Sequence, residues 1–381
     1  MISPDAEDRI PVAIVGGGPA GMALALALQR AGIGAAIFDA REQGAGAKDS
    51  RVLALSHGSR QTLEWMGVWS GVAATPITTI HISQRGGLGR TRITAAEHGL
   101  PALGYVAPAA SLIEALGQAI ATAGIPFHAR SPVEGIAPAS DHIAFTAGGQ
   151  AYHAALLAFA EGAVDAAAAT AGRDYGQHAV LCDVHGKPGH AGCAWERFTP
   201  DGPLALLPHG ERLSVVYTCA PSTADLLLTL DDAAFLSRLQ AQFGARLRFS
   251  AVGPRTRFPL GLRYRRQVTG DRQVWLGNAA QTLHPVAGQG YNLCLRDVRM
   301  LARILTDAPD PGDPGLLARY GAGRRRDRAG TIGFTDSLVR IFSNDIPLLR
   351  HARGAGLLAL DLLPALRGSV ARRMIWGIRG S

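Results

Sequence analysis

Three glycines near the N-terminus stand between two short apolar runs, and this arrangement limits the fold more than any other part of the sequence. The apolar runs cover 11–15 and 34–38, and an Ala- and Leu-rich stretch, 22–30, separates them. The glycines are Gly16, Gly18 and Gly21. A short apolar run, a glycine turn, a helix and a second apolar run are typical of a βαβ unit with buried parallel strands. The chain is therefore predicted to be an α/β protein built on a Rossmann-like parallel sheet.

Glycines at this spacing have a chemical use as well as a structural one. They permit a tight turn, close approach of the backbone to a pyrophosphate and close packing of the helix on its strand. The free amides and the dipole at the start of the helix then favour phosphate binding. Asp39 follows Gly21 by 18 residues, at the end of the second strand, where a carboxylate can accept hydrogen bonds from a ribose. The segment predicts a dinucleotide site, but it does not distinguish NAD from FAD.

A second glycine-bearing segment, 276–292, decides between the two. A strand is predicted to end at Gly277, a loop to run through Pro285 and a helix to begin near Gly290. Gly277 follows Gly16 by 261 residues. A cofactor held by both segments must be long, which favours FAD with its adenosine end at the first segment and its flavin at the second. A plain NAD dehydrogenase would leave the second segment without a role.

Composition and charge narrow the class of protein. Of the 381 residues, 47% are hydrophobic, so there is ample material for a core, and the net charge is +8. No interleaving of aromatic and basic residues marks a nucleic-acid site, so we expect no nucleic-acid partner. The four cysteines are widely spaced and the histidines follow no metal-binding pattern, so we expect reduced thiols and no metal site.

The N-terminus resembles no signal peptide, because it carries Asp5, Glu7 and Asp8 and lacks an apolar core. No uncharged apolar run reaches the ~18 residues of a spanning helix. We therefore expect a cytoplasmic protein. The stretch 354–376 alternates apolar clusters with arginines, which suits either core packing or the inner face of an anionic membrane, so peripheral attachment stays open. Five arginines within 319–328 indicate either a solvated helix face or a docking surface for anionic lipid or a partner.

The predicted elements alternate along the chain between two lobes. We assign 1–75, 100–177 and 268–325 to a discontinuous cofactor-binding domain of helices and parallel strands. The Pro-interrupted β segments of 76–99 and 178–267 are assigned to an antiparallel β domain that covers the substrate, and 326–381 to a C-terminal helical region.

The two glycine segments together resemble the single-component flavin aromatic hydroxylases, which have the para-hydroxybenzoate hydroxylase fold. In that family the second motif reads GDAAHxxxPxxGxGxN, and this chain has Asn278 in place of the acid and Gln281 in place of the histidine. The form GNAAQTLHPxAGQG is similar to the ubiquinone-biosynthesis branch, in particular the 2-polyprenyl-6-methoxyphenol hydroxylases. Three further stretches carry the same resemblance, so that it extends over nearly the whole chain: 49–56, 196–208 and 332–345.

The resemblance implies FAD as the cofactor and a role for particular residues. The first three glycines would contact the FAD pyrophosphate, Asp39 the adenine ribose, and Arg51 the flavin or the pyrophosphate. Gly277 and Asn278 would meet the pyrophosphate or the ribityl chain, since an asparagine can donate or accept there. The residues around the isoalloxazine would be Pro285, Ala287, Gly288, Gln289, Gly290 and Asn292. Amides of this helix start can stabilise negative charge on the reduced flavin.

The loop between Gly277 and Gly290, which the resemblance places beside the flavin, is called the flavin loop below. Two of its residues, His284 and Pro285, are candidates for a catalytic role. For His284 the functional interpretation is a proton relay or a substrate contact. The alternative is a loop histidine bonded to a backbone carbonyl. For Asn278 and Gln281, drift without catalytic meaning stays an alternative. Tyr217, on a predicted strand of the β domain, is either a core residue or a contact for a phenol.

The middle motif of the family, close to ADGxxSxVR, aligns with 160–168. Glu161 and Gly162 preserve the acid and the glycine, but Asp165 stands at the serine and Ala168 at the arginine. That motif is implicated in FAD and NADPH contacts. The electron donor is therefore left open between NADPH and another reductant.

The resemblance implies a monooxygenase of ubiquinone biosynthesis that hydroxylates a polyprenylated phenol with O₂. Reduced FAD would form a C4a-hydroperoxide and pass its distal oxygen to the ring. Two other functions stay open: a flavin hydroxylase of a soluble aromatic compound, and a catalytically weak flavoprotein that serves as a scaffold in a quinone-biosynthesis assembly. Expected partners are the lipid substrate and O₂, with a membrane surface and quinone-biosynthesis proteins as open additions.

Overall fold

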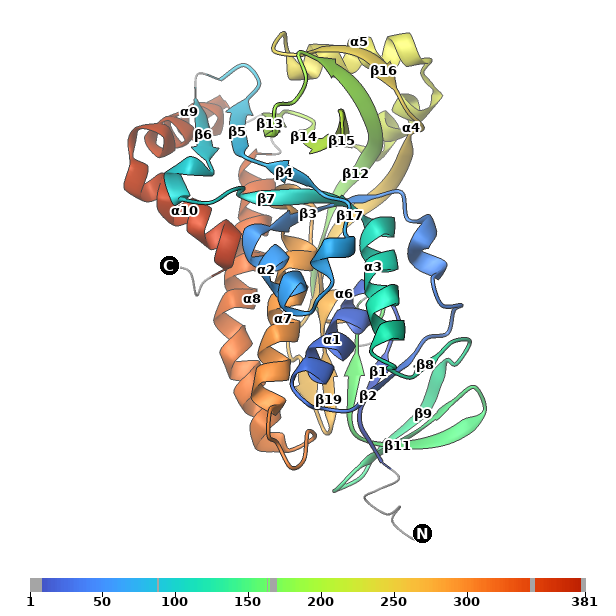
Figure 1. Ribbon diagram of the computed structural model, residues 1–381. Coiled ribbons are helices and arrows are strands. Elements are labelled where there is room, and N and C mark those ends of the chain that lie inside the picture. Colours follow the sequence, from blue (N-terminus) through green and yellow to red (C-terminus); the bar gives the residue numbers. More distant parts are fainter. Residues whose placement is uncertain (1–8, 88, 163, 165–169, 343–346, 378–381) are drawn as a thin grey trace.

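The computed structural model describes residues 9–87, 89–162, 164, 170–342 and 347–377. Figure 1 shows an elongated molecule with a parallel sheet near the N-terminus, a second sheet with α4 and α5 at the opposite end, and α8, α9 and α10 along one side. The predicted fold class is confirmed: a parallel sheet lobe, an antiparallel sheet lobe and C-terminal helices. Outside the described residues lie Asp5, Glu7, Asp8, Asp165, Ala168 and 343–345.

The parallel sheet contains the βαβ unit that the glycines predict. β1 (Ile10–Val15) pairs in parallel with β2 (Ala35–Phe38) on one side and with β11 (Gln150–Phe159) on the other. Both faces of β1 are covered, which explains its unbroken apolar run. The sheet is completed by β8 (Phe127–His128), β19 (Gln273–Trp275), β18 (Thr269–Gly270) and the hairpin of β9 (Val133–Pro138) and β10 (Ile143–Ala147).

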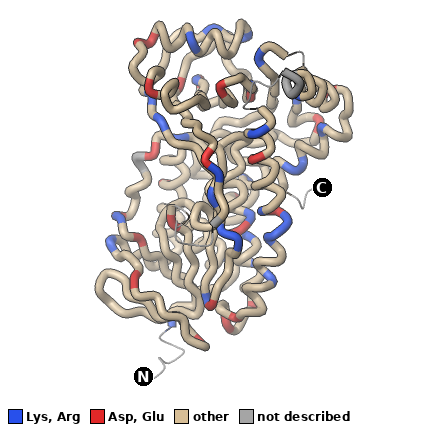
Figure 2. Tube along the Cα trace, turned by 180° about the vertical axis from the view of Figure 1, so that it is seen from behind, with Lys and Arg blue, Asp and Glu red and all other residues tan. Residues whose placement is uncertain are grey.

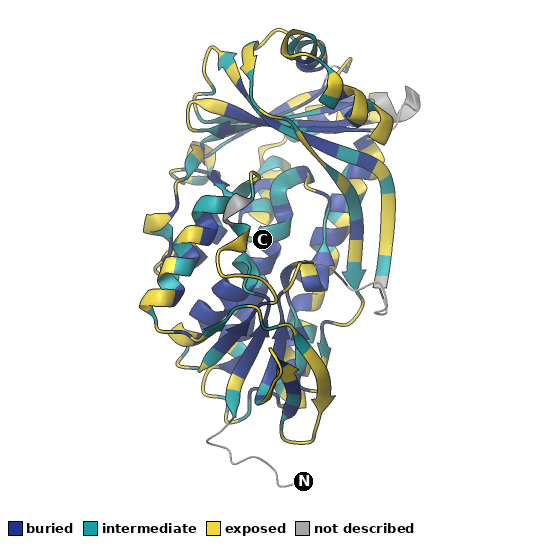
Figure 3. Ribbon diagram, turned by 90° about the vertical axis from the view of Figure 1, so that its right-hand side faces the viewer, coloured by how far each residue is buried: buried dark blue, intermediate teal, exposed yellow. Residues whose placement is uncertain are grey.

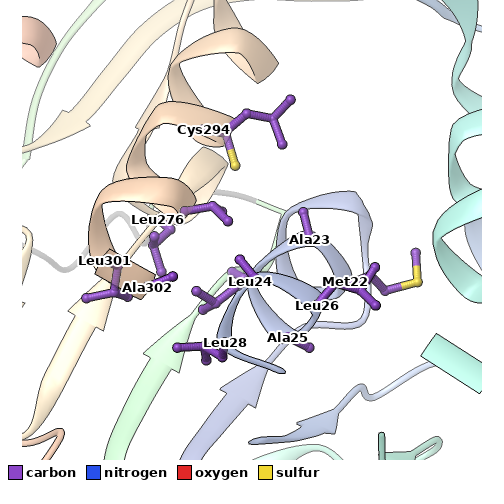
Figure 4. Close-up of a cluster of buried hydrophobic side chains, with 14 of the residues drawn as sticks. Met22, Ala23, Leu24, Ala25, Leu26, Leu28, Leu276, Cys294, Leu301 and Ala302 are labelled. Atoms are coloured by element: carbon purple, nitrogen blue, oxygen red, sulfur yellow. The ribbon is translucent and has the colours of Figure 1, made fainter. Parts of the chain in front are cut away.

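Helix α1 (Pro19–Arg30) packs between this sheet and α7 (Gln289–Leu305). Every residue from 21 to 28 of α1 is buried, because the helix is covered by the sheet, α3 and α7 together. Figure 4 shows the side chains of α1 against those of Leu276, Cys294, Leu301 and Ala302. This contact joins the two glycine segments into one hydrophobic core.

The second sheet is mostly antiparallel and forms the other lobe. Its longest strands, β12 (Thr170–Lys187) and β17 (Thr256–Arg265), pair along most of their length. The remaining strands are β5 (Thr79–Gln84), β6 (Arg90–Thr94), β13 (Cys193–Thr199), β14 (Gly202–His209), β15 (Arg212–Cys219), β16 (Arg248–Val252) and β20 (Gln281–Thr282). A small third sheet contains, in this order, β3 (Val52–Ser56), β7 (Gly104–Pro108) and β4 (Thr75–Ile77). It lies between the two lobes (Figure 1).

The remaining helices cover the sheets or extend along their side. In chain order they are α2 (His57–Trp65), α3 (Ala109–Thr122), α4 (Pro221–Thr229), α5 (Asp232–Phe243), α6 (Gly277–Ala280), α8 (Pro314–Phe342), α9 (Pro347–Leu362) and α10 (Pro364–Trp376). Short 3-10 turns occupy Ala45–Lys48, Trp69–Gly71, Ala96–His98 and Val286–Gly288. Figure 3 shows that buried residues fill the inner faces of both lobes.

A buried ion-pair network joins α7 to α8. Asp297 of α7 accepts from Arg324 Nε at 2.5 Å, and Arg324 Nη1 lies 2.8 Å from Asp327. The second oxygen of Asp297 accepts from Gln281 at 3.0 Å, and Gln281 accepts from Arg328 at 2.7 Å. Arg324 and Arg328 of the 319–328 cluster are thus interior residues, and they belong neither to a solvated helix face nor to a docking surface. The other three arginines of the cluster, Arg319, Arg325 and Arg326, are exposed.

The distribution of charged and apolar residues bears on membrane contact. Figure 2 shows basic and acidic residues interspersed over both lobes. In the described ranges, no single helix combines the length and the hydropathy of a membrane span. His351–Leu362 and Pro364–Trp376 meet those criteria only as a pair, and a bend of 96° separates them. All four cysteines are free thiols, as expected.

Candidate active site

The first glycine turn is shaped by packing at two of its glycines and is open at the third. Gly16 has φ +106°, and a Cβ there would lie 2.9 Å from the backbone nitrogen of Glu161. A Cβ on Gly21 would lie 1.9 Å from the carbonyl oxygen of Gly16. At Gly18 a Cβ would meet nothing within 4 Å. Gly18 is also the N-cap of α1 and caps it with no side chain, so the first amides of the helix are left for a ligand.

Asp39 lies at the end of β2 and closes this turn from beside it. Its Oδ2 accepts from the Gly17 amide at 2.6 Å, and its Oδ1 accepts from the amide and side chain of Arg41 at 2.8 and 3.2 Å. Burial raises the pKa of the Asp39 carboxyl, but the hydrogen bonds from Arg41 and Gly17 outweigh it and hold the pKa below its usual value. The carboxylate is therefore ionised and fixed next to the turn. The Arg41 side chain, which is 62% exposed, also donates to Oδ2 at 3.3 Å, so a ribose hydroxyl would take the place of one of its contacts.

The second glycine segment reaches the same helix start. Gly277 begins α6 with φ +54°, and a Cβ there would lie 3.1 Å from Ala20 Cβ of α1. Tyr291 of α7 donates its hydroxyl to the carbonyl of Pro19 at 3.1 Å. The next residue of α6, Asn278, is exposed. Two segments separated by 261 residues thus converge on the first turn of α1, as a cofactor that spans both requires.

The loop before α7 holds a strained conformation. Ala287 and Gly288 both have left-handed φ, +61° and +60°. A Cβ on Gly288 would lie 2.8 Å from Ala54 Cβ of β3, so only glycine fits there. Left-handed conformations of residues other than glycine cost free energy and gather at functional sites. The turn leads into the N-terminus of α7, where Gly290 has open space around it.

Asn292 fixes this loop to its neighbours. Its Oδ1 accepts from the Ser56 amide at 2.8 Å and from the Ser59 hydroxyl at 2.6 Å. Its Nδ2 donates to the carbonyls of Ala54 at 2.9 Å and Gly288 at 2.6 Å. All the hydrogen-bonding capacity of this side chain is used inside the protein. Asn292 therefore acts on the site by positioning the loop.

Other expected contacts lie around the same region. Gln289 is buried and donates to the carbonyl of Ala287 at 3.1 Å, which braces the turn. Arg51 directly precedes β3 and forms a paired contact with Asp49, at 2.8 and 2.6 Å. The sequence did not indicate that Gln281 joins a buried network. Its hydrogen bonds to Asp297 and from Arg328 give Gln281 a structural role.

These residues fit FAD. The uncapped helix start beside the open Gly18 suits a pyrophosphate, the ionised Asp39 suits the ribose end, and the convergence of both glycine segments suits a long dinucleotide. Glu161 and Gly162 of the middle motif are exposed at the end of β11, beside Gly16.

A cavity of about 230 Å³ lies beside the flavin loop. Residues 284–288 form one wall, strands β5, β13, β14 and β15 form another, and α8, α9 and α10 close it. The lining is almost entirely apolar, and Ile80, Phe198, Leu207, Phe342, Leu357 and Met374 are among its members. Tyr217 is not among them and is a fully buried core residue, in agreement with the structural interpretation. The cavity suits an aromatic ring with an apolar substituent.

His284 stands at the junction of loop and cavity. Its Nδ1 accepts from the Val286 amide at 3.1 Å, so the neutral ring carries its proton on Nε2. In the part of the chain that is described, Nε2 is buried and has no partner. The bond runs to a backbone amide rather than to the carbonyl expected of a loop histidine, and it leaves the Nε2–H donor without a partner among the described residues. Burial lowers the pKa of His284 to about 4.

We predict that His284 makes the stability of the protein depend on pH. Between about pH 6.5 and 4 the unfolded chain protonates this histidine and the folded one does not, so stability falls as pH falls. The full effect is about 3 kcal/mol. Unfolding free energies of FAD-saturated protein, measured from pH 7 to 4, should differ in slope between the wild type and His284→Gln. His351→Gln, at an exposed position, is the control, and equal slopes for all three proteins would contradict the prediction.

Comparisons with known proteins agree with this geometry. A family model described as "FAD binding domain" matches residues 9–334. The chain is 34% identical to ubiquinone hydroxylase UbiL of Rhodospirillum rubrum, over 96% of this chain and 89% of that one. It is 30% identical to 3-demethoxyubiquinol 3-hydroxylase of Escherichia coli, over 93% and 96%. The structure of p-nitrophenol 4-monooxygenase PnpA from Pseudomonas putida superposes with a TM-score of 0.75 at 16% identity, over 95% and 96%.

Proposed function

Since the chain belongs to the family of FAD-binding monooxygenases with the para-hydroxybenzoate hydroxylase fold, we propose that it hydroxylates a phenol ring with a polyprenyl tail in ubiquinone biosynthesis. It is related to the ubiquinone-biosynthesis hydroxylases over nearly its whole length. One structural observation carries the choice of a lipid substrate. The cavity beside the flavin loop is walled by apolar side chains of the C-terminal helices, whose outer faces expose leucines.

Helix α9 has apolar residues on two faces. Leu357 and Leu360 line the cavity. Leu358 and Leu362, spaced four residues apart, lie on another face and are exposed. Leu363 and Leu366 continue the exposed group into α10, and the exposed Arg372 and Arg373 lie further along the same helix. A wall of this kind offers an apolar path for a tail between the cavity and a bilayer.

We further propose that this end of the molecule is the peripheral membrane surface. Exposed leucines next to arginines suit insertion into the interface of an anionic membrane. Leu362 is 67% exposed and Leu363 is 54% exposed, values that a bilayer contact would explain. The proposal applies to the inner membrane face, where anionic headgroups meet cytoplasmic proteins.

Replacing both leucines, Leu362→Glu with Leu363→Glu, should lower binding to anionic vesicles at least tenfold. The substitution removes apolar side chains that the bilayer would bury, and it adds negative charges that the anionic headgroups repel. The measurement is co-sedimentation of the FAD-bound protein with phosphatidylglycerol-containing vesicles. Ser222→Glu with Leu226→Glu, at two exposed positions of α4 in the antiparallel lobe, adds the same two charges, is the matched control and should bind like the wild type. Equal loss in both variants would assign the effect to net charge alone and contradict the proposal.

The chemistry divides between cofactor and protein. FAD, when bound, supplies the redox chemistry that activates O₂. The residues of the chain bind and orient it: Gly18 and the helix start would meet the pyrophosphate, and Asp39 the ribose. The amides of 287–290, at the start of α7, would stabilise negative charge at the flavin ring. The apolar cavity would hold the phenol ring and exclude water.

A comparison of two substrates tests the proposal. The FAD-bound protein, reduced with light and then mixed with O₂, is given a methoxyphenol with a two-isoprene tail or the same ring with a methyl group instead. The tailed phenol should reach half-maximal hydroxylation at a concentration at least tenfold lower, because the tail buries apolar surface. Equal use of both rings would favour a hydroxylase of soluble aromatics. Failure to hydroxylate either, with FAD bound, would favour the scaffold alternative.

A further inference from the structure

Glu196 is an acidic side chain on the wall of an otherwise apolar cavity. It lies in β13 between Ala194 and Phe198, two residues away on either side, and all three line the cavity. Across the described residues, its Oε1 is buried and has no hydrogen-bond partner. Burial raises the pKa of this carboxyl to about 7. A buried acid without a donor destabilises the protein, so a ligand hydroxyl that satisfies it would gain binding energy.

Among the residues that the structure describes, no opposing charge on the neighbouring elements faces Glu196. In the sheet, Glu196 is paired with Ala205 of β14 and Ile82 of β5. The adjacent Arg197 donates instead to the carbonyl of Gln242 and the hydroxyl of Ser83. From α8, α9 and α10 the side chains that reach the cavity are apolar: Phe334, Leu338, Phe342, Leu357, Leu360, Val370 and Met374.

The described lining of the cavity holds one other titratable side chain, His284. It is neutral above about pH 4, because burial lowers its pKa. Near neutral pH, Glu196 is therefore the group of the cavity that can change its charge. A carboxyl with a pKa near the working pH is well matched to general base catalysis.

We propose that Glu196 is a catalytic residue, the base that accepts the proton of the substrate's phenolic hydroxyl during hydroxylation. The inference rests on the proposed function, which puts a phenol in this cavity. In the step, the phenolic O–H bond breaks and the proton forms a new O–H bond with an oxygen of the Glu196 carboxylate. The electron pair stays on the phenolic oxygen and is delocalised to the ring carbons ortho and para to it. Those carbons become better nucleophiles, and the proton leaves to solvent when the product departs.

Single-turnover hydroxylation tests the role. In FAD-bound protein reduced with light and mixed with O₂, Glu196→Gln should hydroxylate the tailed phenol about 10²–10⁴-fold more slowly. The concentration for half-maximal rate should change less than about threefold. The wild-type rate should rise with pH through about 7, and the variant should lose that rise. Fluorinated, more acidic phenols should restore part of the rate in Glu196→Gln and gain little in the wild type.

The controls separate this role from a structural one. Glu134→Gln, at an exposed position of β9, should behave like the wild type in every measurement. Glu196→Asp keeps a carboxylate and should retain the rise of rate with pH at a reduced rate. If Glu196→Gln keeps the wild-type rate and pH profile, the proposal is wrong.

A binding measurement decides the role of Glu196 even if no phenol is hydroxylated. The probe is 4-nitrophenol, whose ionisation is visible, bound to the oxidised FAD-bound protein. Carboxyl and phenol share one proton in the complex, so above about pH 7 the wild-type Kd should rise about tenfold per pH unit. Glu196→Gln should bind the phenolate without that rise. Parallel pH dependences in the two proteins would overturn the inference, whereas absent hydroxylation with the expected difference in binding would overturn only the proposed function.

Discussion

Asp297→Ala should lower the free energy of unfolding by about 3 kcal/mol, at the low end of the range for a broken buried ion pair because Asp327 still contacts Arg324. Asp297 and Arg324 are almost completely buried, with exposed fractions of 1% and 4%. Without the carboxylate, Arg324 keeps its charge in the interior with one partner fewer, and Gln281 loses its acceptor. The measurement is urea unfolding of the FAD-saturated protein.

A surface pair provides the comparison. Arg60 and Glu64 are spaced four residues apart on α2, with a contact of 3.3 Å between partly exposed side chains. Glu64→Ala should cost less than about 0.5 kcal/mol, because solvent screens such a pair. Equal effects of the two substitutions would show that the α7–α8 network contributes no more than an exposed ion pair.

The second large effect concerns the first glycine turn. Gly18→Val should leave the FAD-free protein folded, since the side chain begins in open space and the backbone, at φ −77°, suits any residue. It should weaken FAD binding at least tenfold, about 1.4 kcal/mol, because the side chain then occupies the place expected for the pyrophosphate. Isothermal titration of the FAD-free protein with FAD gives the affinity, and circular dichroism reports the fold.

Gly21→Val is the matched variant one helical turn away. Its Cβ would lie 1.9 Å from a backbone carbonyl oxygen, so α1 must shift from β1 and the fold itself should be destabilised. The two glycines of one motif should therefore fail in different ways. If Gly18→Val binds FAD as tightly as the wild type, the pyrophosphate does not bind at the start of α1.

Local patterns explain which parts of the molecule could be predicted. The βαβ unit follows from an apolar run, a glycine turn and a second apolar run, all within neighbouring residues. The approach of Gly277 to the start of α1 is a long-range contact. It could be predicted because a long cofactor needs both glycine segments.

The unpredicted features depend on pairings between distant elements. Arg324, Asp327 and Arg328 share a helix face, and this spacing was the available signal that some of the arginines point inward. Their partner Asp297 lies on another helix, and Gln281 precedes it by 16 residues. Glu196 lies within a stretch that carries the family resemblance, but its burial depends on which face of β13 is turned to the C-terminal helices. One residue of shift in register would point it the other way.

A single turnover with labelled oxygen tests the proposed hydroxylation most directly. FAD-bound protein is reduced with light in the absence of O₂, which removes the question of the natural electron donor. It is then mixed with ¹⁸O₂ and a methoxyphenol bearing a two-isoprene tail, and the product is identified by mass spectrometry. We predict one ¹⁸O atom in a new ring hydroxyl, with product formed in proportion to bound flavin. Reoxidation of the flavin with only hydrogen peroxide formed, and no labelled ring, would contradict the proposed hydroxylation.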